Sequence, residues 1–312
     1  MKRSIVGGIG QAAKDILIIV DKYPKYGLKK RVEQIIIDGG GPVANALYTL
    51  SKFGIKTRIS TVVGDDNDGD FIIKKLKEVN IDTQYIMRRK SALSHVAYIV
   101  VEKTTGNRTI FYKPCSGRDL SSLELDSNFF NNISFLHLDG FQEEISIYAA
   151  KYAHKNSIPV MLDAGSYKEY MTKIIKLTDY VVASSVFAEH YGFDRSLKKF
   201  KELVKYFKRP HLTITMGENG SITFDNGIIF WTPAYNIKAL DTTGAGDVFH
   251  GAMIYGILRR FDIIKSVKFA TVVAALKCRD YGGRRGIPTL NYAMKHLEKL
   301  KQPTILHYKG KI

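Results

Sequence analysis

The stretch Asp241-Thr-Thr-Gly-Ala-Gly-Asp247 has the residue types and spacing best suited to chemistry, and an apolar run typical of a helix follows it. The first N–H groups of a helix have no partner within the helix, and with the helix dipole they attract anions. Glycine lets an anion approach the backbone closely because it has no side chain. Gly244, Ala245 and Gly246 therefore predict an anion hole, and Asp247 places a carboxylate beside it.

A carboxylate beside an anion hole suits phosphoryl transfer to an alcohol. The carboxylate accepts the hydroxyl proton, and the N–H groups stabilise charge on the transferring phosphoryl group. Asp247 could instead only cap the helix. Capping does not account for the glycines, the alanine and the preceding Asp-Thr-Thr, which all lack bulk. With about 6% usage at each of six positions, a chance match is on the order of 10⁻⁵ per chain.

The elements that must position this turn alternate regularly after residue 58. Such alternation of β-rich runs with helical patterns indicates right-handed βαβ units and a parallel sheet that is covered on both faces. The expected strands are Arg58 to Val63, Phe135 to Leu138, Val160 to Leu162, Tyr180 to Ala183 and Leu212 to Met216. The expected helices are Asp68 to Val79, 144–156, 167–177, 186–191 and 195–207.

Two stretches break this alternation, approximately 15–38 and 95–115. Both are strand-like, lack a long helix and contain turn signals, Tyr23-Pro-Lys-Tyr-Gly27 in the first and Lys103-Thr-Thr-Gly-Asn107 in the second. They predict a small antiparallel sheet that projects from the α/β body as a lid. No linker long enough to divide the chain is visible, so we expect residues 1–312 to form one domain with this lid inserted.

Composition excludes some functions and leaves one alternative open. The 312 residues are 45% hydrophobic and 25% charged, which is typical of a folded globular protein. The formal charge of +17 raises the alternative of a nucleic-acid-binding or regulatory protein without turnover. We expect a dispersed basic surface instead, because acidic residues separate the basic ones and the densest run, 195–209, has the spacing of an amphipathic helix.

Cysteine usage and hydropathy bear on localisation. Cys115 and Cys278 are far apart and have no Cys or His nearby in the spacing of a zinc site, which favours a reducing, cytoplasmic environment. The longest uninterrupted apolar runs, such as Ile16 to Val20, are far shorter than the roughly 18 residues of a membrane span.

The motif at 241–247 resembles the second signature of the ribokinase-like (PfkB) carbohydrate kinase family. Gly39-Gly-Gly-Pro-Val-Ala-Asn45, followed by Phe53-Gly54 and Val63-Gly-Asp-Asp-Asn-Asp-Gly69, resembles the first signature. The resemblance covers nearly the whole chain. It implies a three-layer α/β fold with a mostly parallel central sheet and a small antiparallel β lid, and an ATP-dependent sugar kinase that needs Mg²⁺.

The resemblance also assigns roles to single residues of this sequence. Asp247 is the expected base, with Gly244, Ala245 and Gly246 as the anion hole. The expected substrate-binding residues are Asp15, Gly41, Asn45, Asn107 and Arg108, and the expected nucleotide-binding residues are Thr215, Gly217 and Gly220. Asp241 and the carbonyls near Thr243 and Gly282 match a site for a monovalent cation, K⁺, that several members use. The resemblance further implies a homodimer formed through the lid.

The sequence departs from the family pattern in two places. The Asn-x-x-Glu that helps to organise Mg²⁺ has no clean match in Ala183-Ser-Ser-Val-Phe-Ala-Glu189, and Pro42-Val43 replaces the Lys-Gly of ribokinases. The C-terminal part resembles sulfofructose kinases, and other segments, including Gly106-Asn-Arg-Thr-Ile110, resemble ketohexokinases. The acceptor therefore stays open between a neutral sugar and an anionic one, which Arg108 and Lys14 would hold. A nucleoside kinase of the same fold is the main alternative.

Overall fold

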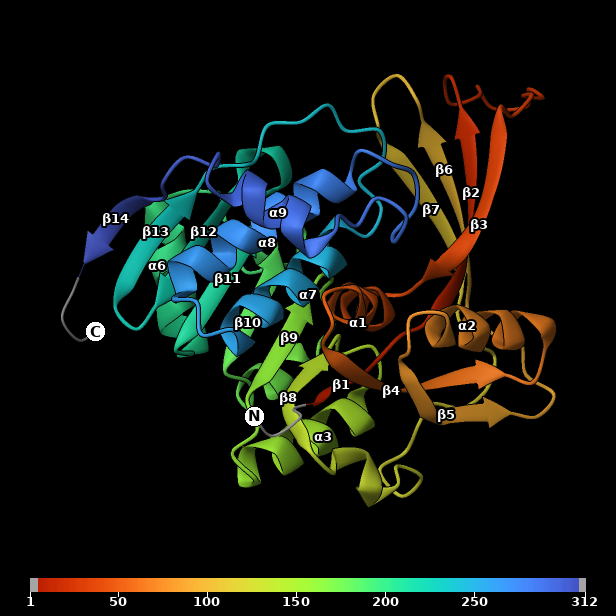
Figure 1. The fold of residues 1–312 in the computed structure, drawn as a ribbon, viewed down its shortest axis with the longest axis horizontal. Helices are drawn as coiled ribbons and strands as arrows, with labels where there is room; N and C mark the ends of the chain where they lie inside the picture. The colour runs from red at the N-terminus through yellow and green to blue at the C-terminus, as the bar shows by residue number, and fades with distance from the viewer. Residues whose placement is uncertain (1–4, 309–312) are drawn as a thin grey trace.

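The central sheet determines where the functional residues lie. The computed structural model describes residues 5–308, and its ribbon shows a broad layered body from which a small sheet projects (Figure 1). The sheet has two parts. From β11 to β5, in the order in which the strands lie side by side, all neighbouring strands pair in parallel, and the strands from β11 to β14 pair antiparallel. The order is β14 (Thr304–Tyr308), β13 (Ile228–Thr232), β12 (Ser221–Asp225), β11 (His211–Thr215), β10 (Tyr180–Ser184), β9 (Val160–Ala164), β8 (Ile133–Leu138), β1 (Ile5–Ile9), β4 (Lys56–Gly64) and β5 (Asp82–Arg89).

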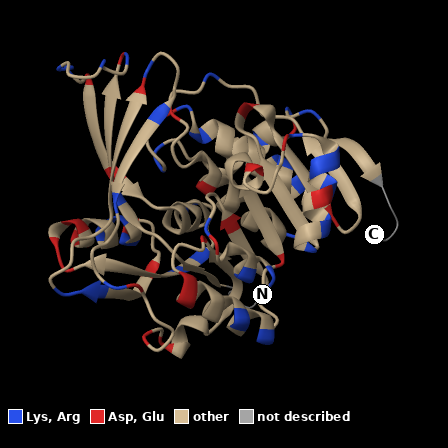
Figure 2. Ribbon diagram, turned by 180° about the vertical axis from the view of Figure 1, so that it is seen from behind, with Lys and Arg blue, Asp and Glu red and all other residues tan. Residues whose placement is uncertain are grey.

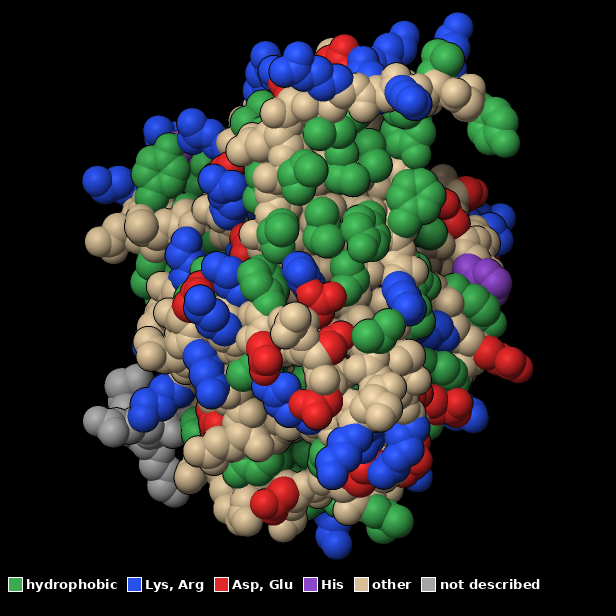
Figure 3. Space-filling view, turned by 90° about the vertical axis from the view of Figure 1, so that its right-hand side faces the viewer, with side chains coloured by type: hydrophobic (Ala, Val, Ile, Leu, Met, Phe, Trp, Pro, Cys, Tyr) green, Lys and Arg blue, Asp and Glu red, His purple; other side chains and the backbone are tan. Residues whose placement is uncertain are grey.

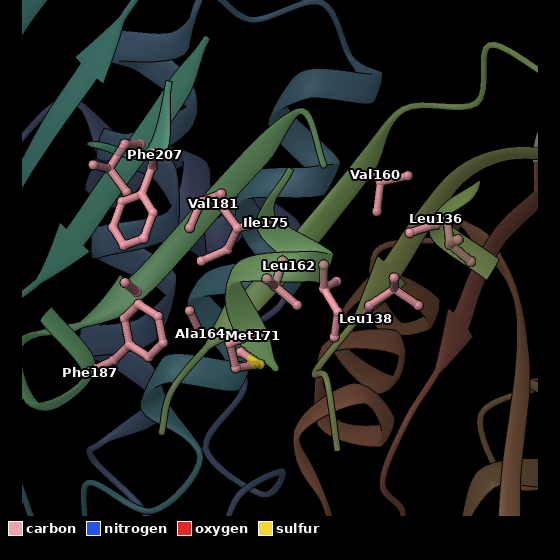
Figure 4. Close-up of a cluster of buried hydrophobic side chains, with 14 of the residues drawn as sticks. Leu136, Leu138, Val160, Leu162, Ala164, Met171, Ile175, Val181, Phe187 and Phe207 are labelled. Carbon is pink, nitrogen blue, oxygen red and sulfur yellow. The ribbon is translucent and has the colours of Figure 1, made fainter. Parts of the chain in front are cut away.

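Helices cover both faces of this sheet, which confirms the three-layer prediction (Figure 1). One hydrophobic core joins the strands to α3 (Glu143–Lys155), α4 (Met171–Ile175), α5 (Ser185–Glu189) and α6 (Leu197–Phe207). Figure 4 shows part of it, with Leu138 and Leu162 pointing from the sheet toward Met171. The second core includes α1 (Pro42–Lys52), α2 (Asn67–Lys77), α7 (Ala245–Leu258), α8 (Ile263–Lys277) and α9 (Leu290–Leu297).

The projecting sheet is built from two hairpins that lie side by side. Its spatial order is β3 (Gln34–Gly40), β2 (Ala13–Val20), β6 (Val96–Glu102) and β7 (Arg108–Lys113). β2 pairs antiparallel with β3 and β6 antiparallel with β7, while β2 and β6 join the two hairpins in parallel. These strands fall close to the expected inserts at 15–38 and 95–115, although β2 begins at Ala13 and β3 extends to Gly40.

The basic residues do not form one continuous surface. Figure 2 shows Lys and Arg on both the body and the lid, with Asp and Glu between them. The densest basic run of the sequence contains α6, which buries Phe200, Leu203, Val204 and Phe207 and leaves Lys198 and Lys205 exposed. Within residues 5–308, no helix is both long enough and apolar enough to cross a membrane.

Candidate active site

The turn at 244–246 opens helix α7 and leaves room in front of it. Gly244 has a φ of 71°, and a Cβ there would lie 2.8 Å from the Cα of Gly283. Gly246 is exposed, and a Cβ on it would meet nothing within 4 Å. The helix therefore begins at open space, where its first N–H groups and its dipole favour an anion.

One N–H of the predicted anion hole has a partner within the turn. The N–H of Ala245 donates to the carbonyl oxygen of Thr242 at 3.2 Å, so it closes the turn instead of facing a ligand. Gly246 and Asp247 follow within the first helical turn, where N–H groups have no carbonyl partner one turn earlier. The donors of this hole are thus expected from Gly244, Gly246 and the backbone of Asp247.

Asp247 ends a chain of hydrogen bonds that links three distant parts of the sequence. The Asn45 side chain in α1 donates through Nδ2 to Asp247 Oδ2 at 2.8 Å. Arg284, which is 2% exposed, donates through Nε to Asn45 Oδ1 at 2.7 Å and through Nη2 to Gly40 O at 3.1 Å. This chain holds one oxygen of the carboxylate in place, and among the described residues no side chain hydrogen-bonds to Oδ1.

Asp15 lies on β2 in the same buried neighbourhood. Burial raises the pKa of its carboxyl to about 7, and the charge of Asp247 also raises it, whereas Arg284 lowers it. Its oxygens lie so close to Gly40 that a Cβ there would be 2.1 Å from Oδ1. The next glycine, Gly41, has a φ of 94° and caps the start of α1, and a Cβ there would lie 2.5 Å from the Gln11 carbonyl oxygen. The two glycines therefore allow the start of α1 to pack closely against Asp15 and the residues just before β2.

Two further carboxylates at strand ends were missed by the sequence reasoning. Asp139 follows β8 and accepts from the backbone N–H of Gln11 at 2.7 Å. Asp163 lies in β9, and its pKa is raised to about 6, chiefly by burial and in part by the charge of Asp247, while His250 lowers it. Because ligands of α/β sheets bind at the carboxyl ends of parallel strands, strand position alone was a signal for both. His250 places Nε2 3.7 Å from Asp163 and bonds Gly246 O through Nδ1 at 2.6 Å.

The lid contacts the 241–247 turn through Arg108. This residue is exposed on β7 and donates to the Thr242 hydroxyl, so it lies at the 241–247 turn. Asn107 precedes it at the hairpin turn and is also exposed. Lys14, the other cation considered for an anionic acceptor, pairs with Asp68 of α2 at 2.6 Å.

The predicted nucleotide loop lies at the carboxyl end of β11. Thr215 ends that strand and donates its hydroxyl to Ala183 O at 3.2 Å. Gly217 is exposed and begins the short 3₁₀ turn η2 (Gly217–Asn219). Gly220 is buried with a φ of 78°, and a Cβ there would be 2.1 Å from Thr232 O, so close packing against β13 already requires this glycine.

Most of the oxygens that the family resemblance assigned to a monovalent cation accept hydrogen bonds within the protein. Asp241 is fully buried; its Oδ1 accepts from the Thr243 N–H at 2.8 Å and hydroxyl at 2.7 Å, and its Oδ2 accepts from the Gly282 N–H at 2.7 Å. The carbonyls of Asp241 and Thr243 accept from Lys277 Nζ. The sequence reasoning missed Lys277, although a lysine in line with buried Ala270 and Val273 on α8 was a signal.

No protein cage for Mg²⁺ is present in the part of the chain that the structure describes, since no three His, Cys, Asp or Glu side chains gather as a metal site. The only carboxylate of the altered Asn-x-x-Glu segment, Glu189, is exposed.

Comparison with known proteins establishes the family. The model of the pfkB family carbohydrate kinases matches residues 8–290. A ribokinase of Lactococcus lactis is 25% identical over 95% of this chain and 98% of its own. The ketohexokinase of Mus musculus is 21% identical over 86% and 94%, and a nucleoside kinase of Methanothermobacter thermautotrophicus is 22% identical over 92% and 93%.

A solved structure extends the likeness to three dimensions. The Arabidopsis thaliana ribokinase complexed with ribose and ATP superposes with a TM-score of 0.83 at 20% identity, covering 96% of this chain and 99% of that one. The chain belongs to the pfkB family of carbohydrate kinases. It is a phosphotransferase of the class of ATP-dependent carbohydrate or nucleoside kinases.

Proposed function

We propose that this protein is a sugar kinase that transfers the γ-phosphoryl group of MgATP to a hydroxyl of a sugar or sugar-like acceptor. The observation that carries the proposal is Asp247, which stands in the first turn of α7 with Oδ2 held by Asn45 and open space before Gly246. A base and an anion hole thus share one helix start, which is the arrangement that phosphoryl transfer to an alcohol requires.

Asp247 and the helix start divide the reaction between them. Asp247 Oδ1 accepts the proton of the acceptor hydroxyl as the oxygen attacks the γ-phosphorus. The bond between the γ-phosphorus and the β–γ bridging oxygen breaks, ADP leaves, and the proton stays on Asp247 until it passes to solvent. The N–H groups of Gly244, Gly246 and Asp247 stabilise the phosphate charge. Mg²⁺ that enters with the nucleotide would neutralise part of that charge.

Asp15, Gly41 and Asn45 form the proposed acceptor pocket. A carboxyl group and an amide together offer the donors and acceptors that neighbouring hydroxyls need. The lid contributes Asn107 and Arg108 from above the turn, and Arg108 already contacts Thr242. We place the nucleotide along the carboxyl edge of the sheet, from Gly246 toward the loop of Thr215, Gly217 and Gly220, because this edge is where α/β sheets bind their ligands.

We propose a homodimer through the lid. Ile16 and Ile18 of β2 lie opposite Ile37 and Ile35 of β3, and Tyr98 of β6 lies between Ile16 and Phe111 of β7 in the register. These side chains form one apolar face, and Figure 3 shows hydrophobic side chains gathered over the lid. Ile35, Ile37, Tyr98 and Phe111 are 47–57% exposed, and an exposed apolar patch of this kind marks an interaction site.

Sedimentation velocity tests the dimer. The wild type should sediment as a dimer, and Ile37→Lys should sediment as a monomer because it places a charge in the apolar face. Lys103→Glu, at the tip of the same lid, is the matched control and should leave the dimer intact. A monomeric wild type at micromolar concentration would remove the proposal. We also propose one domain over 1–312, and a cytoplasmic location, which agrees with free Cys115 and Cys278.

A nucleoside kinase is the second candidate, because the same base and anion hole serve a nucleoside hydroxyl and one relative carries that name. A non-catalytic nucleic-acid-binding protein fits less well, since the basic residues are interspersed with acidic ones (Figure 2). ADP release measured with ribose, fructose, fructose 6-phosphate, ketodeoxygluconate and adenosine as acceptors separates the candidates. Acceptor-dependent turnover with one of the sugars supports the proposal, and turnover with adenosine alone overturns it in favour of the nucleoside.

A further inference from the structure

Lys277 is a buried lysine whose ammonium group contacts the 241–247 turn. It is the last residue of α8, and its side chain is fully buried. Its Nζ donates to the carbonyl oxygens of Asp241, at 3.0 Å, and of Thr243. Both carbonyls belong to the segment for which the family resemblance implied a site for K⁺. We propose that the Lys277 ammonium replaces that cation, so that this kinase needs no K⁺; the inference rests on the proposed phosphoryl transfer.

The oxygens around this position fit an ammonium better than an additional metal ion. Lys277 takes two of the carbonyls, and the Asp241 carboxylate accepts three hydrogen bonds from Thr243 and Gly282. A K⁺ ion that used the same carbonyls would have to displace the ammonium or face its like charge in a buried site, where such repulsion is weakly screened. The site therefore already contains its single positive charge.

The position of this charge explains how it would serve the reaction. A trans peptide directs its C=O and N–H to opposite sides, so when Lys277 bonds the Thr243 carbonyl, the N–H of Gly244 points away from Lys277. Hydrogen bonding at the carbonyl polarises that peptide and strengthens the N–H as a donor. Lys277 is thus a positioning residue: it holds the turn between Asp241 and Gly244 and makes the anion hole more electropositive.

Burial of a lysine is unfavourable unless its ammonium is well satisfied. Burial lowers the pKa of Lys277, and the nearby charges of Asp241 and Asp247 raise it. The same helix contains a second buried lysine, Lys268, whose Nζ bonds the Gln302 side chain at 3.1 Å, away from this turn. Lys268 therefore supplies a matched control, since it is also a buried lysine of α8.

The first experiment measures the wild type in tetramethylammonium, Na⁺, NH₄⁺ and K⁺ chlorides at constant ionic strength. The kcat and KM for the acceptor, and the Kd of a non-hydrolysable ATP analogue, should be the same in all four salts within experimental error. A kcat or an analogue affinity of the wild type that rises specifically with K⁺ would overturn the inference. A wild type that binds the analogue equally in all salts but phosphorylates no acceptor would instead refute the proposed function.

The second experiment tests whether a dissolved cation can replace the ammonium group of Lys277. Lys277→Ala should lose roughly 10²-fold in kcat in tetramethylammonium, as when one donor of an anion hole is removed. NH₄⁺ or K⁺, which fit the vacated space, should restore part of that loss, whereas tetramethylammonium is too large. Lys277→Met should lose activity without rescue, and Lys268→Ala should match the wild type. A folded Lys277→Met with wild-type kcat would contradict the inference; if both Lys277 variants fail to fold, the wild-type salt series decides.

Discussion

Replacement of Asp15 by asparagine should make the protein more stable at alkaline pH and not at acidic pH. Burial raises the pKa of Asp15 from 3.8 to about 7 in the folded state. The folded protein therefore binds a proton that the unfolded chain has released between these pH values, and stability falls as the pH rises from about 4 to about 7. Because the folded and unfolded pKa differ by about three pH units, ionisation of Asp15 lowers the free energy of unfolding by on the order of 4 kcal/mol at alkaline pH.

Asp15→Asn removes this cost because its amide is never ionised. The variant and the wild type should unfold at similar temperatures near pH 4.5, and the variant should unfold several degrees higher at pH 8.5, at roughly 2 °C per kcal/mol for a chain of this size. Thermal unfolding followed by circular dichroism in steps across this range measures the difference. The gap between the two curves should widen through pH 7 and then stay constant.

Asp21→Asn is the control with the opposite sign. Asp21 is exposed just after β2, and hydrogen bonding from Lys30 lowers its pKa. Its contribution to stability is present above the unfolded pKa and lost as the pH falls, so its removal cannot stabilise the protein at pH 8.5. Unfolding curves of the wild type and Asp15→Asn that stay parallel from pH 4.5 to 8.5 would refute the reasoning about Asp15.

Three further substitutions probe the helix start and the hydrogen-bond chain. Gly246→Ala should leave the unfolding temperature unchanged but weaken binding of a non-hydrolysable ATP analogue in calorimetry, because its Cβ enters only open space; unchanged affinity would argue against a phosphate there. Gly244→Ala should instead lower stability by about 1 kcal/mol or more, since its φ is 71°. Arg284→Met should lower kcat by roughly 10²-fold and move the acidic limb of the pH–rate profile upward, because Arg284 holds Asn45 and lowers the pKa of Asp15. An unshifted profile with normal kcat would show that Arg284 only fills space.

Local patterns accounted for much of the fold and predicted the helix start on which the proposed site is built. The turn at 241–247 was recognisable because its small residues precede an apolar run, and α7 indeed begins at Ala245. The five strands with predicted bounds match β4, β8, β9, β10 and β11 to within about two residues, because buried parallel strands are short and apolar. The strands β5, β12, β13 and β14 were not predicted. The lid hairpins were predicted from their turns, but the parallel pairing of β2 with β6 has no local signal.

The residues that the sequence did not reveal contact partners that are far away in the sequence. Arg284 meets Asn45 across 239 positions, and nothing near either residue indicates the pair. Lys277 is one of several lysines in α8, and in the sequence only its position on the buried face of the helix distinguishes it from the others. The role of Ala245 also depended on three dimensions, because only the turn geometry shows that its N–H bonds Thr242.

The central claim is that Asp247 accepts the proton of the acceptor hydroxyl, and the most direct measurement is the phosphorylation rate of Asp247→Asn with the acceptor found in the panel. Asp262→Asn is the matched control, because Asp262 only caps α8 and asparagine caps equally well. We predict that Asp247→Asn unfolds at the wild-type temperature and loses roughly 10²- to 10⁴-fold in kcat, while the control keeps full activity. A folded Asp247→Asn that turns over at the wild-type rate would contradict this mechanism.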